Sequence, residues 1–384
     1  MISGAKYPYG SVGRVCSRCV MDESVPDIWF DGLGECNYCK MHYRLVADNP
    51  NDERGRENLL QIAKEAKTAG NNGNYDVVVG VSGGTDSTYL LHLVRELELR
   101  PLAVHLDNGW NSEVAVNNLR NVLEVLDIDL YTHVIEWLEF RDILRAQLKS
   151  GLPWADGPTD LGIIAVLYQA AIKFGVKTIF VGNNFRTEGR QPDFWTHADT
   201  RQLRYVHKKY GNGKRNTYPM QSPFKLFFQA SVKGVKMHRP FYHIPFNKSE
   251  AKVLISDLYG WKDYGGHHHE NIFTRFIIGA WMPQKFGIDK RKVTFSAYIR
   301  SGEMDRGTAI QTLHAPAYDL KLMQEDYAYV AKKLGFSSAE MKQIWDAPNL
   351  SILDYPSYYH LYQMFKKISK SIFRHILPFR PMMS

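Results

Sequence analysis

The chain contains little cysteine: only four of its 384 residues are cysteine, and all four lie within the first forty positions. No thiol therefore remains beyond residue 39 to act as a nucleophile. The sequence also lacks an apolar run long enough to span a bilayer and an apolar signal-peptide core near its N-terminus. The absence of later cysteines excludes cysteine-based catalysis beyond residue 39. We expect a cytoplasmic protein without a transmembrane segment.

The cysteines form two Cys-x-x-Cys pairs, and a spacer containing Gly32 and Gly34 separates the pairs. Two such pairs can place four thiolates around one tetrahedral ion, which is the arrangement that Zn²⁺ prefers. A redox pair normally begins a helix beside a βαβ unit, and disulfides are uncommon without export. Residues 1–45 are therefore predicted to form a structural zinc module held by Cys16, Cys19, Cys36 and Cys39.

The composition indicates a folded protein with a basic surface. Hydrophobic residues make up 44% of the chain, the formal net charge is +8 and the pI is about 9.1. A basic balance suits polyanionic partners such as nucleotides, nucleotide sugars or RNA, although many soluble enzymes carry a similar charge. The charge alone does not choose among these partners.

From residue 75 onward, apolar strand-like runs alternate with helical patterns. Strands are predicted over 75–81, 102–106, 130–134 and 178–181, with helices over 88–97, 114–126 and 159–174 between them, the last capped by Thr159-Asp160. Such alternation predicts an α/β fold with a doubly wound parallel sheet. We expect four parts: the zinc module, a connector over 46–74 with a helix near 57–67, a nucleotide domain over 75–250, and a mostly helical region over 251–384.

Residues 318–346 are predicted to be helical. Two other segments, 185–238 and 358–376, are basic, and residues 185–238 are predicted to be a loop-rich surface insertion. Residues 358–376 repeat apolar side chains at helical spacing with lysines between them. That tail either packs on its own protein or binds a partner or an anionic surface.

The most informative stretch is Gly80-Val-Ser-Gly-Gly-Thr-Asp-Ser87, which follows the first predicted strand and leads into a helix. Glycines at such a turn let backbone N–H groups close on a phosphate, and the helix N-terminus adds partial positive charge. We predict that the phosphate is held by Ser82, Gly83, Gly84, Thr85 and Ser87. Asp86 is predicted to orient this loop or to help bind Mg²⁺. The alternative for Asp86 and Ser87 is simple helix capping, and the two roles are compatible.

Two later segments are expected at the same edge of the sheet. Asp107 follows the second strand and Gly182-Asn183 follows the fourth, and ligands of doubly wound sheets gather beyond the carboxyl ends of the strands. Asp107 lies by the adenosine or only forms a turn with Asn108 and Gly109. Gly182 and Asn183 are predicted near the α-phosphate, with Thr187 and Glu188 close by.

The Ser-Gly-Gly-x-Asp-Ser string resembles the pyrophosphate loop (PP-loop) of ATP-pyrophosphatases, whose fold is adenine nucleotide alpha-hydrolase-like. Longer stretches resemble the N-acetyl sugar amidotransferases of bacterial surface-polysaccharide and nonulosonic acid biosynthesis, including lipopolysaccharide O-antigen. The resemblance covers most of residues 12–310 and is carried by Val15-Cys-Ser-Arg-Cys-Val-Met-Asp22, the PP-loop, Gly182-Asn-Asn-Phe-Arg-Thr-Glu-Gly189, Gly265-Gly-His-His-His-Glu-Asn-Ile-Phe-Thr-Arg275, Lys285-Phe-Gly-Ile-Asp-Lys-Arg-Lys292 and Ile299-Arg-Ser-Gly-Glu-Met304.

The resemblance implies a ligase reaction in which ATP and ammonia convert the N-acetyl group of a nucleotide-activated sugar into an acetamidino group, with release of AMP and pyrophosphate. ATP, Mg²⁺ and structural Zn²⁺ are the implied cofactors. A built-in glutaminase is not expected, because the chain starts Met1-Ile2 and has no later cysteine. A separate glutaminase is therefore expected to supply ammonia, a cyclase-like subunit that channels the ammonia is a further candidate partner, and no nucleic acid is expected.

Polar residues in the segments after residue 182 that carry the resemblance are the candidates for catalysis and substrate binding. His268, His269 and Glu270, which follow His267, are predicted to bind substrate or to remove a proton from the attacking ammonia, unless they only cap a helix at the surface. Glu188 is a further catalytic candidate. Lys285, Lys290 and Arg291 are candidates to stabilise the leaving pyrophosphate, or are simply solvated.

Two other functions fit parts of the sequence. A tRNA-modifying PP-loop enzyme of the lysidine type needs no thiol and suits the basic charge, whereas tRNA thiolation through cysteine is excluded by the committed cysteines. A zinc-bearing binding protein with an inactive nucleotide site is the third hypothesis. The intact PP-loop argues against it.

Overall fold

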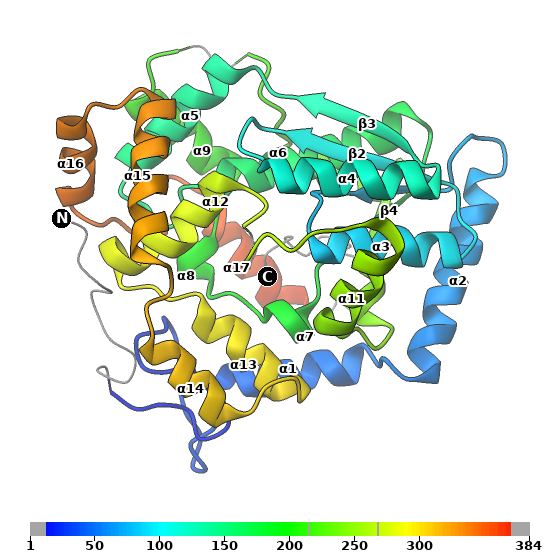
Figure 1. Ribbon diagram of the computed structural model, residues 1–384, viewed down its shortest axis with the longest axis horizontal. Helices are drawn as coiled ribbons and strands as arrows, with labels where there is room; N and C mark the ends of the chain where they lie inside the picture. The colour runs from blue at the N-terminus through cyan, green and yellow to red at the C-terminus, as the bar shows by residue number, and fades with distance from the viewer. Residues whose placement is uncertain (1–12, 214–215, 267–268, 370–384) are drawn as a thin grey trace.

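The computed structural model describes residues 13–213, 216–266 and 269–369. Its centre is a five-stranded sheet in the order β3-β2-β1-β4-β5, and every pair of neighbouring strands is parallel (Figure 1). The strands are β1 (Val77–Gly80), β2 (Pro101–Asp107), β3 (Asp129–Val134), β4 (Thr178–Phe180) and β5 (Lys236–His238). The strand order reverses direction between β1 and β4, which confirms the predicted doubly wound fold.

Helices cover both faces of the sheet because alternate strand residues point to opposite sides. Val77 and Val79 pack in one hydrophobic cluster with α3 (Thr85–Glu96), α4 (Glu113–Leu126), α11 (Lys248–Tyr259) and α2 (Glu53–Gly70). Val78 packs in the other cluster, beneath α6 (Gly157–Lys173). β1 is thus buried on both faces, and the loop that follows it starts from a rigid base.

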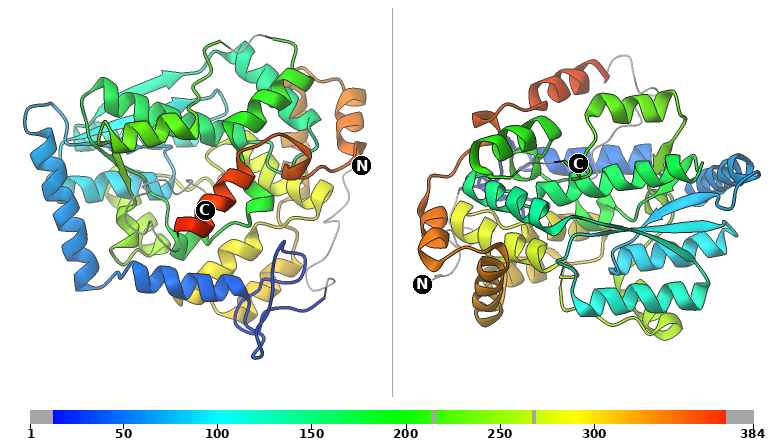
Figure 2. Two further views of the ribbon diagram at one scale, coloured as in Figure 1. Left: turned by 180° about the vertical axis from the view of Figure 1, so that it is seen from behind. Right: turned by 90° about the horizontal axis from the view of Figure 1, so that it is seen from above.

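The region after residue 270 is helical, as predicted. It contains α12 (Ile272–Phe276), a π-helical segment (Ile277–Phe286), α13 (Arg291–Ser301), α14 (Arg306–His314), α15 (Leu320–Leu334), α16 (Ser338–Asp346), a 3₁₀ turn (Ile352–Asp354) and α17 (Tyr359–Ser369). α13 packs against the short helix α7 (Phe185–Glu188), and α15 packs against α12 and α5 (Trp137–Lys149). Figure 2 shows α17, in red, on the face that is turned away in Figure 1.

The N-terminal cysteine module leads into α1 (Asn37–Asp48), which contacts both α7 and α13. In Figure 1, α1 runs along one side of the molecule below these helices. The cysteine module therefore abuts the helical region that follows the sheet, although hundreds of residues separate the two in sequence.

Two expectations about the secondary structure are wrong. Residues 185–238 are not mainly loop, because they form α7, α8 (Asp193–Thr196), α9 (Thr200–Tyr210), α10 (Pro223–Ser231) and the edge strand β5; a 3₁₀ turn (Pro240–Tyr242) follows. α6 begins at Gly157 with Asp156 as its N-cap, not at Thr159-Asp160. Pro158 lies in the first turn, where no intrahelical N–H bond is required.

Two further predicted boundaries differ from those of the structure: the ends of the connector helix and the domain boundary after residue 250. The connector helix is longer than 57–67, and the boundary expected between residues 250 and 251 lies inside α11. Residues 370–376 of the expected tail helix lie outside the described residues. Across the part of the chain that the structure describes, no helix combines the length and apolar character needed to cross a bilayer.

Candidate active site and metal centre

The loop between β1 and α3 is held in a fixed shape by its own hydrogen bonds. Ser87 Oγ accepts from the Ser82 amide at 3.2 Å and donates to the Gly84 carbonyl at 3.2 Å, while the Gly84 amide donates to Ser82 Oγ at 3.2 Å. Gly83 has a φ of +77°, and a Cβ there would lie 2.1 Å from the Ala115 carbonyl oxygen. Position 83 therefore requires glycine, both for its backbone angle and for space.

The first turn of α3 faces this loop without a side-chain cap. Its N-cap is Gly84, which cannot cap the helix, and Asp86 and Ser87 make their bonds elsewhere. The alternative that Asp86 and Ser87 merely cap α3 is therefore not what the structure shows. A helix N-terminus preceded by a glycine-rich turn is a suitable site for an anion.

Asp86 forms an ion pair with a residue that the sequence analysis did not select. Lys248 Nζ lies 3.1 Å from Asp86 Oδ2, and both side chains are more than four-fifths buried. Asn247 caps α11 through its side-chain oxygen and so fixes Lys248 in the first turn. Burial lowers the pKa of Lys248, but the charge of Asp86, with Tyr298, Tyr264 and Glu188, raises it above its ordinary value. Lys248 thus stays an ammonium ion beside the loop.

Asp86 also has an oxygen left for a ligand. Its Oδ1 atom is buried and has no hydrogen-bond partner among the described residues. A carboxylate oxygen in such a position is a suitable ligand for Mg²⁺, which usually takes one or two protein carboxylates together with substrate phosphates. The residues present therefore fit the predicted magnesium ion.

The end of β4 approaches the same loop. A Cβ on Gly182 would lie 3.2 Å from the Asp86 carbonyl oxygen, and Asn183 Nδ2 donates to Glu188 Oε2 at 3.3 Å. Glu188 ends the short helix α7, which α13 holds in place. Asp86, Gly182, Asn183 and Glu188 are thus brought together, as expected from their positions after parallel strands. Thr187 lies in the same helix and is buried.

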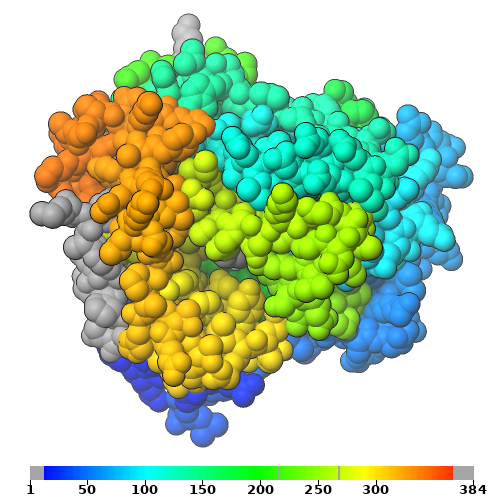
Figure 3. All heavy atoms as spheres, viewed as in Figure 1, coloured from blue at the N-terminus to red at the C-terminus, as the bar shows by residue number. Residues whose placement is uncertain are grey.

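Glu270 reaches the loop through a short antiparallel contact. The Ser112 amide donates to the Glu270 carbonyl at 2.8 Å, and the Ile272 amide donates to the Trp110 carbonyl at 2.9 Å. Glu270 Oε1 consequently lies 3.5 Å from where a Cβ on Gly84 would be. Figure 3 shows a hollow in this face of the molecule, between the yellow-green segment of α11 and α12 and the yellow and orange helices α13–α15.

Tyr264 and His269 lie close to Glu270. The Tyr264 hydroxyl oxygen accepts from the Thr85 amide at 3.3 Å, and burial together with Glu270 raises the pKa of its phenol. The ring of His269 packs edge-on against Tyr318, with centroids 5.5 Å apart. His267 and His268 lie outside the described residues.

Asp107 makes the turn that was one of its two alternatives. Its Oδ1 accepts from the Gly109 amide at 2.9 Å and from Asn111 Nδ2 at 3.5 Å. Asp107 is nonetheless at the carboxyl end of β2, next to β1 and its loop. Its place beside the adenosine stays a prediction.

The three basic candidates near residue 290 differ in their contacts, and two of them bond to backbone carbonyls. Lys285 Nζ donates to the Trp345 carbonyl at 2.7 Å and also to Ala347, so it ties the π-helical segment to the end of α16. Arg291 pairs with Asp289 at 2.7 Å and donates to the carbonyls of Thr312, in the last turn of α14, and Ala315, just after it. These contacts are structural and give no support to the predicted catalytic role of Lys285.

Lys290 instead faces the site. Its Nζ lies 4.3 Å from the ring centroid of Trp154, whose indole N–H donates to Asp160 Oδ2 at 2.7 Å. Burial lowers the pKa of Lys290 to about 8, against the opposing influence of Asp160, Glu188 and Asp156. Lys290 therefore lies within a group of acidic and aromatic side chains, and Glu188 acts on the pKa of both Lys290 and Lys248.

Sequence reasoning missed Lys248, Tyr264, Trp154 and Asp160 as members of the site. The string Asn247-Lys248-Ser249-Glu250 has only the pattern of a helix start, with Asn247 as N-cap. A cation in the first turn of a helix is unusual, because it opposes the helix dipole. That mismatch was the available signal for Lys248.

A separate cavity of about 680 Å³ lies at the other end of α3 from the loop. It is lined by the start of α2, the end of α3 and Ile244-Pro245. None of the predicted site residues lines this cavity, so it is separate from the candidate active site.

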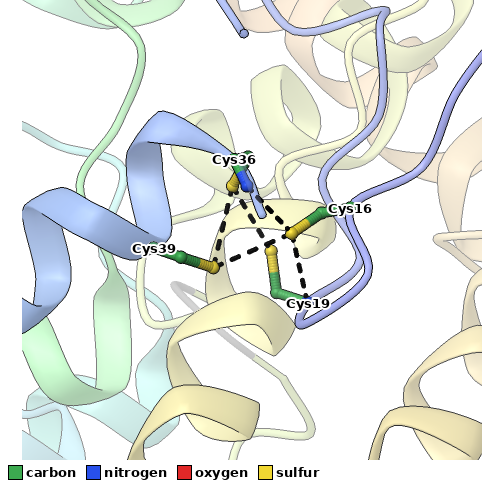
Figure 4. A group of neighbouring side chains, drawn as sticks. All are labelled: Cys16, Cys19, Cys36 and Cys39. Atoms are coloured by element: carbon green, nitrogen blue, oxygen red, sulfur yellow. Dashed lines mark hydrogen bonds between the residues drawn. The ribbon is translucent and has the colours of Figure 1, made fainter. Parts of the chain in front are cut away.

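The four cysteines form one compact, fully buried cluster (Figure 4). All four sulfur atoms lie within 4.8 Å of one another, and three of the Sγ–Sγ distances are 3.7, 3.8 and 3.9 Å. A tetrahedral ion with metal–sulfur bonds of about 2.3 Å requires sulfur–sulfur distances of about 3.8 Å. In a four-iron cluster each thiolate binds a different iron, which separates the sulfur atoms further. The cluster therefore fits a single metal ion.

Side chains of α13 and α14 anchor the cysteine cluster to the helical region. Arg300 donates to Cys39 Sγ at 3.3 Å and to Cys19 Sγ at 3.5 Å, while Arg306 donates to the carbonyls of Cys16 and Cys19 at 3.1 Å. A buried ion pair adds to this, because Lys292 Nζ lies 2.7 Å from an oxygen of Asp22. The metal centre and the active site thus share α13, which carries Arg300 and follows Lys290.

Residues 270–369 match the family model described as the C-terminal domain of WbpG-like lipopolysaccharide (LPS) biosynthesis proteins. The match covers about a quarter of the chain and includes Glu270 and all of α12 to α17. No curated protein sequence matches the chain. The family match and the phosphate loop on a parallel sheet support an ATP-dependent enzyme, and they leave its reaction open.

Three solved structures show partial likeness. The NH₃-dependent NAD synthetase of Campylobacter jejuni is 13% identical, with 77% of this chain and 98% of that chain covered and a TM-score of 0.32. The NMN synthetase of Francisella tularensis is 16% identical, with 56% and 95% covered and a TM-score of 0.26. The U34-tRNA thiolase NcsA of Methanococcus maripaludis, solved with its [4Fe-4S] cluster, is 15% identical, with 73% and 80% covered and a TM-score of 0.30. TM-scores this low support no functional conclusion.

Proposed function

We propose that the protein is an ATP-dependent N-acetyl sugar amidotransferase, which converts the acetamido group of a nucleotide-activated sugar into an acetamidino group. The observation that carries the proposal is the preformed phosphate loop with its Asp86–Lys248 pair, in a chain whose C-terminal part matches a WbpG-like LPS biosynthesis domain. The absence of any cysteine beyond residue 39 excludes a thiol intermediate.

In this proposal the loop holds the β- and γ-phosphates of ATP. The backbone amides and hydroxyls of Ser82 to Ser87 donate to the phosphate oxygens, and Lys248 neutralises charge that develops on the leaving pyrophosphate. Mg²⁺, bound by the open oxygen of Asp86, would supply further charge neutralisation between the phosphates. The α-phosphate then lies toward Gly182 and Asn183, beside Glu188.

The reaction needs two displacements because an amide oxygen is a poor leaving group. The acetamido oxygen attacks the α-phosphorus, the bond to the bridging oxygen breaks, and pyrophosphate leaves with that electron pair. Ammonia then adds to the carbon of the O-adenylyl imidate and loses a proton. AMP departs with the former amide oxygen, and the amidine remains. No covalent bond to the enzyme forms at any stage.

The group around Lys290 is assigned to the acceptor side. Asp160 and Glu188 supply carboxylates for sugar hydroxyls, the buried Trp154 positions Asp160 and Lys290, and Lys290 can lose its proton near neutral pH. A neutral amine close to the reacting carbon can take the proton released by the attacking ammonia. Lys290 is thus assigned to proton transfer instead of pyrophosphate binding, and Glu270 is the second candidate base.

The cysteine cluster is assigned to structural Zn²⁺. The short distances between its sulfur atoms fit one tetrahedral ion, and the cluster is closed, with no open position for a substrate. Ammonia is proposed to come from a separate glutaminase subunit, because no thiol beyond Cys39 is present for glutamine hydrolysis.

The direct test is to incubate the full chain with ATP, Mg²⁺, ammonium chloride and a panel of nucleotide-linked N-acetyl sugars. AMP formation that depends on one sugar, together with a product lighter by the difference between O and NH, supports the proposal. A parallel reaction with bulk tRNA in place of the sugar tests the lysidine-type alternative. AMP release that depends on tRNA and not on sugar would replace the proposed function with that alternative.

A further inference from the structure

The charge of this chain is distributed very unevenly. The sequence has no aspartate or glutamate between Thr200 and Ser249, and none after Asp354. Over the same two stretches it has the basic residues Arg201, Arg204, Lys208, Lys209, Lys214, Arg215, Lys225, Lys233, Lys236, Arg239, Lys248, Lys366, Lys367, Lys370, Arg374 and Arg380. Because the whole chain carries only +8, the remaining residues are net acidic.

The described start of the second stretch, around Ser357 and Tyr358, lies beside the first stretch in the fold. The guanidinium group of Arg201 donates to the Ser357 carbonyl and lies 5.9 Å from the ring centroid of Tyr358. The ring of Phe224 also packs edge-on against Tyr358, at 6.1 Å. Contacts at Tyr358 thus join α9, α10 and the start of α17 into one surface, called here the α9–α10–α17 face. It includes α17, in red in Figure 2.

The same face exposes apolar side chains that a water-soluble surface normally buries. α10 buries Leu226, Gln229 and Ala230 against the protein and turns its aromatic residues outward. Phe224 is 62% exposed, Phe228 50% and Phe227 44%, and the neighbouring Val232 is 66% exposed. α17 adds exposed Met364 and Phe365. Lysines 225 and 233 are exposed beside these side chains.

The nearest carboxylates do not offset this charge toward solvent. Asp142 accepts from His207 and from the amides of Asn212 and Gly213, and Asp199 accepts from the amides of Arg201 and Tyr358. Both side chains are mostly buried. Asp193, which accepts from Gln363 of α17, is partly buried, and Asp354 is an exposed acid shortly before α17. The cations of the α9–α10–α17 face outnumber these neighbouring acids, so the face presents net positive charge and apolar groups to solvent.

We propose that the α9–α10–α17 face docks the protein onto an anionic lipid bilayer. Exposed Phe, Val and Met side chains flanked by Lys and Arg are the features of segments that lie in a membrane interface, where apolar groups enter the acyl boundary and cations meet anionic headgroups. RNA would satisfy the cations, but it offers little to Val232 and Met364. In Figure 1, α17 lies behind the molecule, so docking leaves the hollow of Figure 3 open to solvent.

The test is sedimentation of the full chain with vesicles of phosphatidylglycerol and phosphatidylcholine, and with vesicles of phosphatidylcholine alone. We expect binding to the anionic vesicles, loss of that binding at high salt, and no binding to the neutral ones. The double variant Phe227→Ser/Phe228→Ser and the variant Lys225→Glu/Lys233→Glu should each weaken binding at least about tenfold. The matched control Val125→Ser alters an equally exposed apolar side chain on α4 and should bind as the wild type does.

Several outcomes would overturn the proposal. These are no binding to anionic vesicles, binding that survives both double variants, or binding to bulk tRNA that is lost in the same variants. A concentration-dependent dimer that Phe227→Ser/Phe228→Ser abolishes would assign the face to a second copy of the chain. Thermal unfolding of each variant checks that these exposed substitutions leave the fold intact.

Discussion

Lys248 Nζ lies 3.1 Å from Asp86 Oδ2, in a mostly buried pair that joins the first turn of α11 to the phosphate loop. The two residues are 162 positions apart in the sequence, and only the folded sheet brings them together. The pair leaves Asp86 Oδ1 buried and without a hydrogen-bond partner among the described residues. A cation and a carboxylate are thereby held at the place where a triphosphate and its metal ion are proposed to bind.

Removal of the Lys248 charge is expected to slow AMP formation. Lys248→Met should lower kcat at least about a hundredfold, because a fixed cation at the leaving group is lost, and Lys248→Arg should recover part of it. Asp86→Asn should raise the Mg²⁺ concentration needed for half-maximal rate. The measurement is AMP formation as a function of Mg²⁺. Lys252→Met, which removes a more exposed lysine of α11 paired with Asp263, is the control and should leave the rate unchanged.

Lys290 is expected to give the rate a pH dependence. Its pKa is lowered to about 8 by burial, so the fraction of neutral amine grows as the pH rises through that value. If Lys290 accepts a proton from ammonia, the rate should rise through pH 8, and Lys290→Gln should remove that rise. A rate that falls over the same range would assign Lys290 to charge stabilisation of pyrophosphate. Saturating ammonia at each pH separates the enzyme's titration from that of the substrate.

The same group should influence stability. The folded protein releases the Lys290 proton near pH 8, whereas the unfolded chain holds it to about pH 10.5. Unfolding therefore takes up a proton between these values, and this residue makes the free energy of unfolding rise with pH across that window. Urea unfolding of the wild type and of Lys290→Gln at several pH values should show the slope only in the wild type.

The buried pair of Asp22 and Lys292 is expected to hold the cysteine module against α13. Asp22→Ala leaves the Lys292 ammonium buried without its partner, which should cost about 3–5 kcal/mol in the free energy of unfolding. Urea denaturation is the measurement. Asp346→Ala breaks the exposed pair with Lys342 and should leave stability nearly unchanged. Equal effects of the two substitutions would mean that the Asp22–Lys292 pair contributes no more to the free energy of unfolding than an exposed pair does.

Arg300 is expected to control how tightly the metal is held. Four thiolates around Zn²⁺ carry two net negative charges, and Arg300 donates to two of the sulfur atoms. Arg300→Met should therefore release zinc to a chelator at least about tenfold more readily. Arg306→Met removes bonds to cysteine carbonyls only and should have a smaller effect. Metal analysis of the purified protein should find one zinc and no iron per chain.

The sheet could be predicted from sequence because β1 is a continuous apolar run, β2 and β4 are mostly apolar, and the strand-like segment of β3 mixes apolar with polar residues at a spacing that fits the alternation of strands and helices. β5 escaped prediction because Lys236-Met-His238 is only three residues long, and its pairing with β4 comes from tertiary contact instead of local propensity. The predicted start of α6 lies two residues after the observed start. Pro158 suggests a break in the pattern, whereas proline is well tolerated in the first turn of a helix.

The site was predicted in part for a similar reason. The loop, Gly182, Asn183 and Glu188 follow parallel strands, and strand order alone brings such residues to one edge of the sheet. Glu270 and Lys248 come from segments whose positions depend on tertiary packing: one pairs with residues after β2, the other begins a helix over α3. Lys285 was selected from its charge, yet its ammonium bonds to backbone carbonyls at the end of α16.

The most direct measurement is the fate of the acetamido oxygen. A nucleotide-linked N-acetyl sugar labelled with ¹⁸O in that carbonyl is incubated with ATP, ammonium chloride and the protein, and the products are analysed by mass spectrometry. The proposed mechanism predicts that the label appears in AMP and that the sugar product contains an amidine. Label that stays on the sugar while AMP is released would contradict the transfer of AMP to the amide oxygen, on which the proposed function depends.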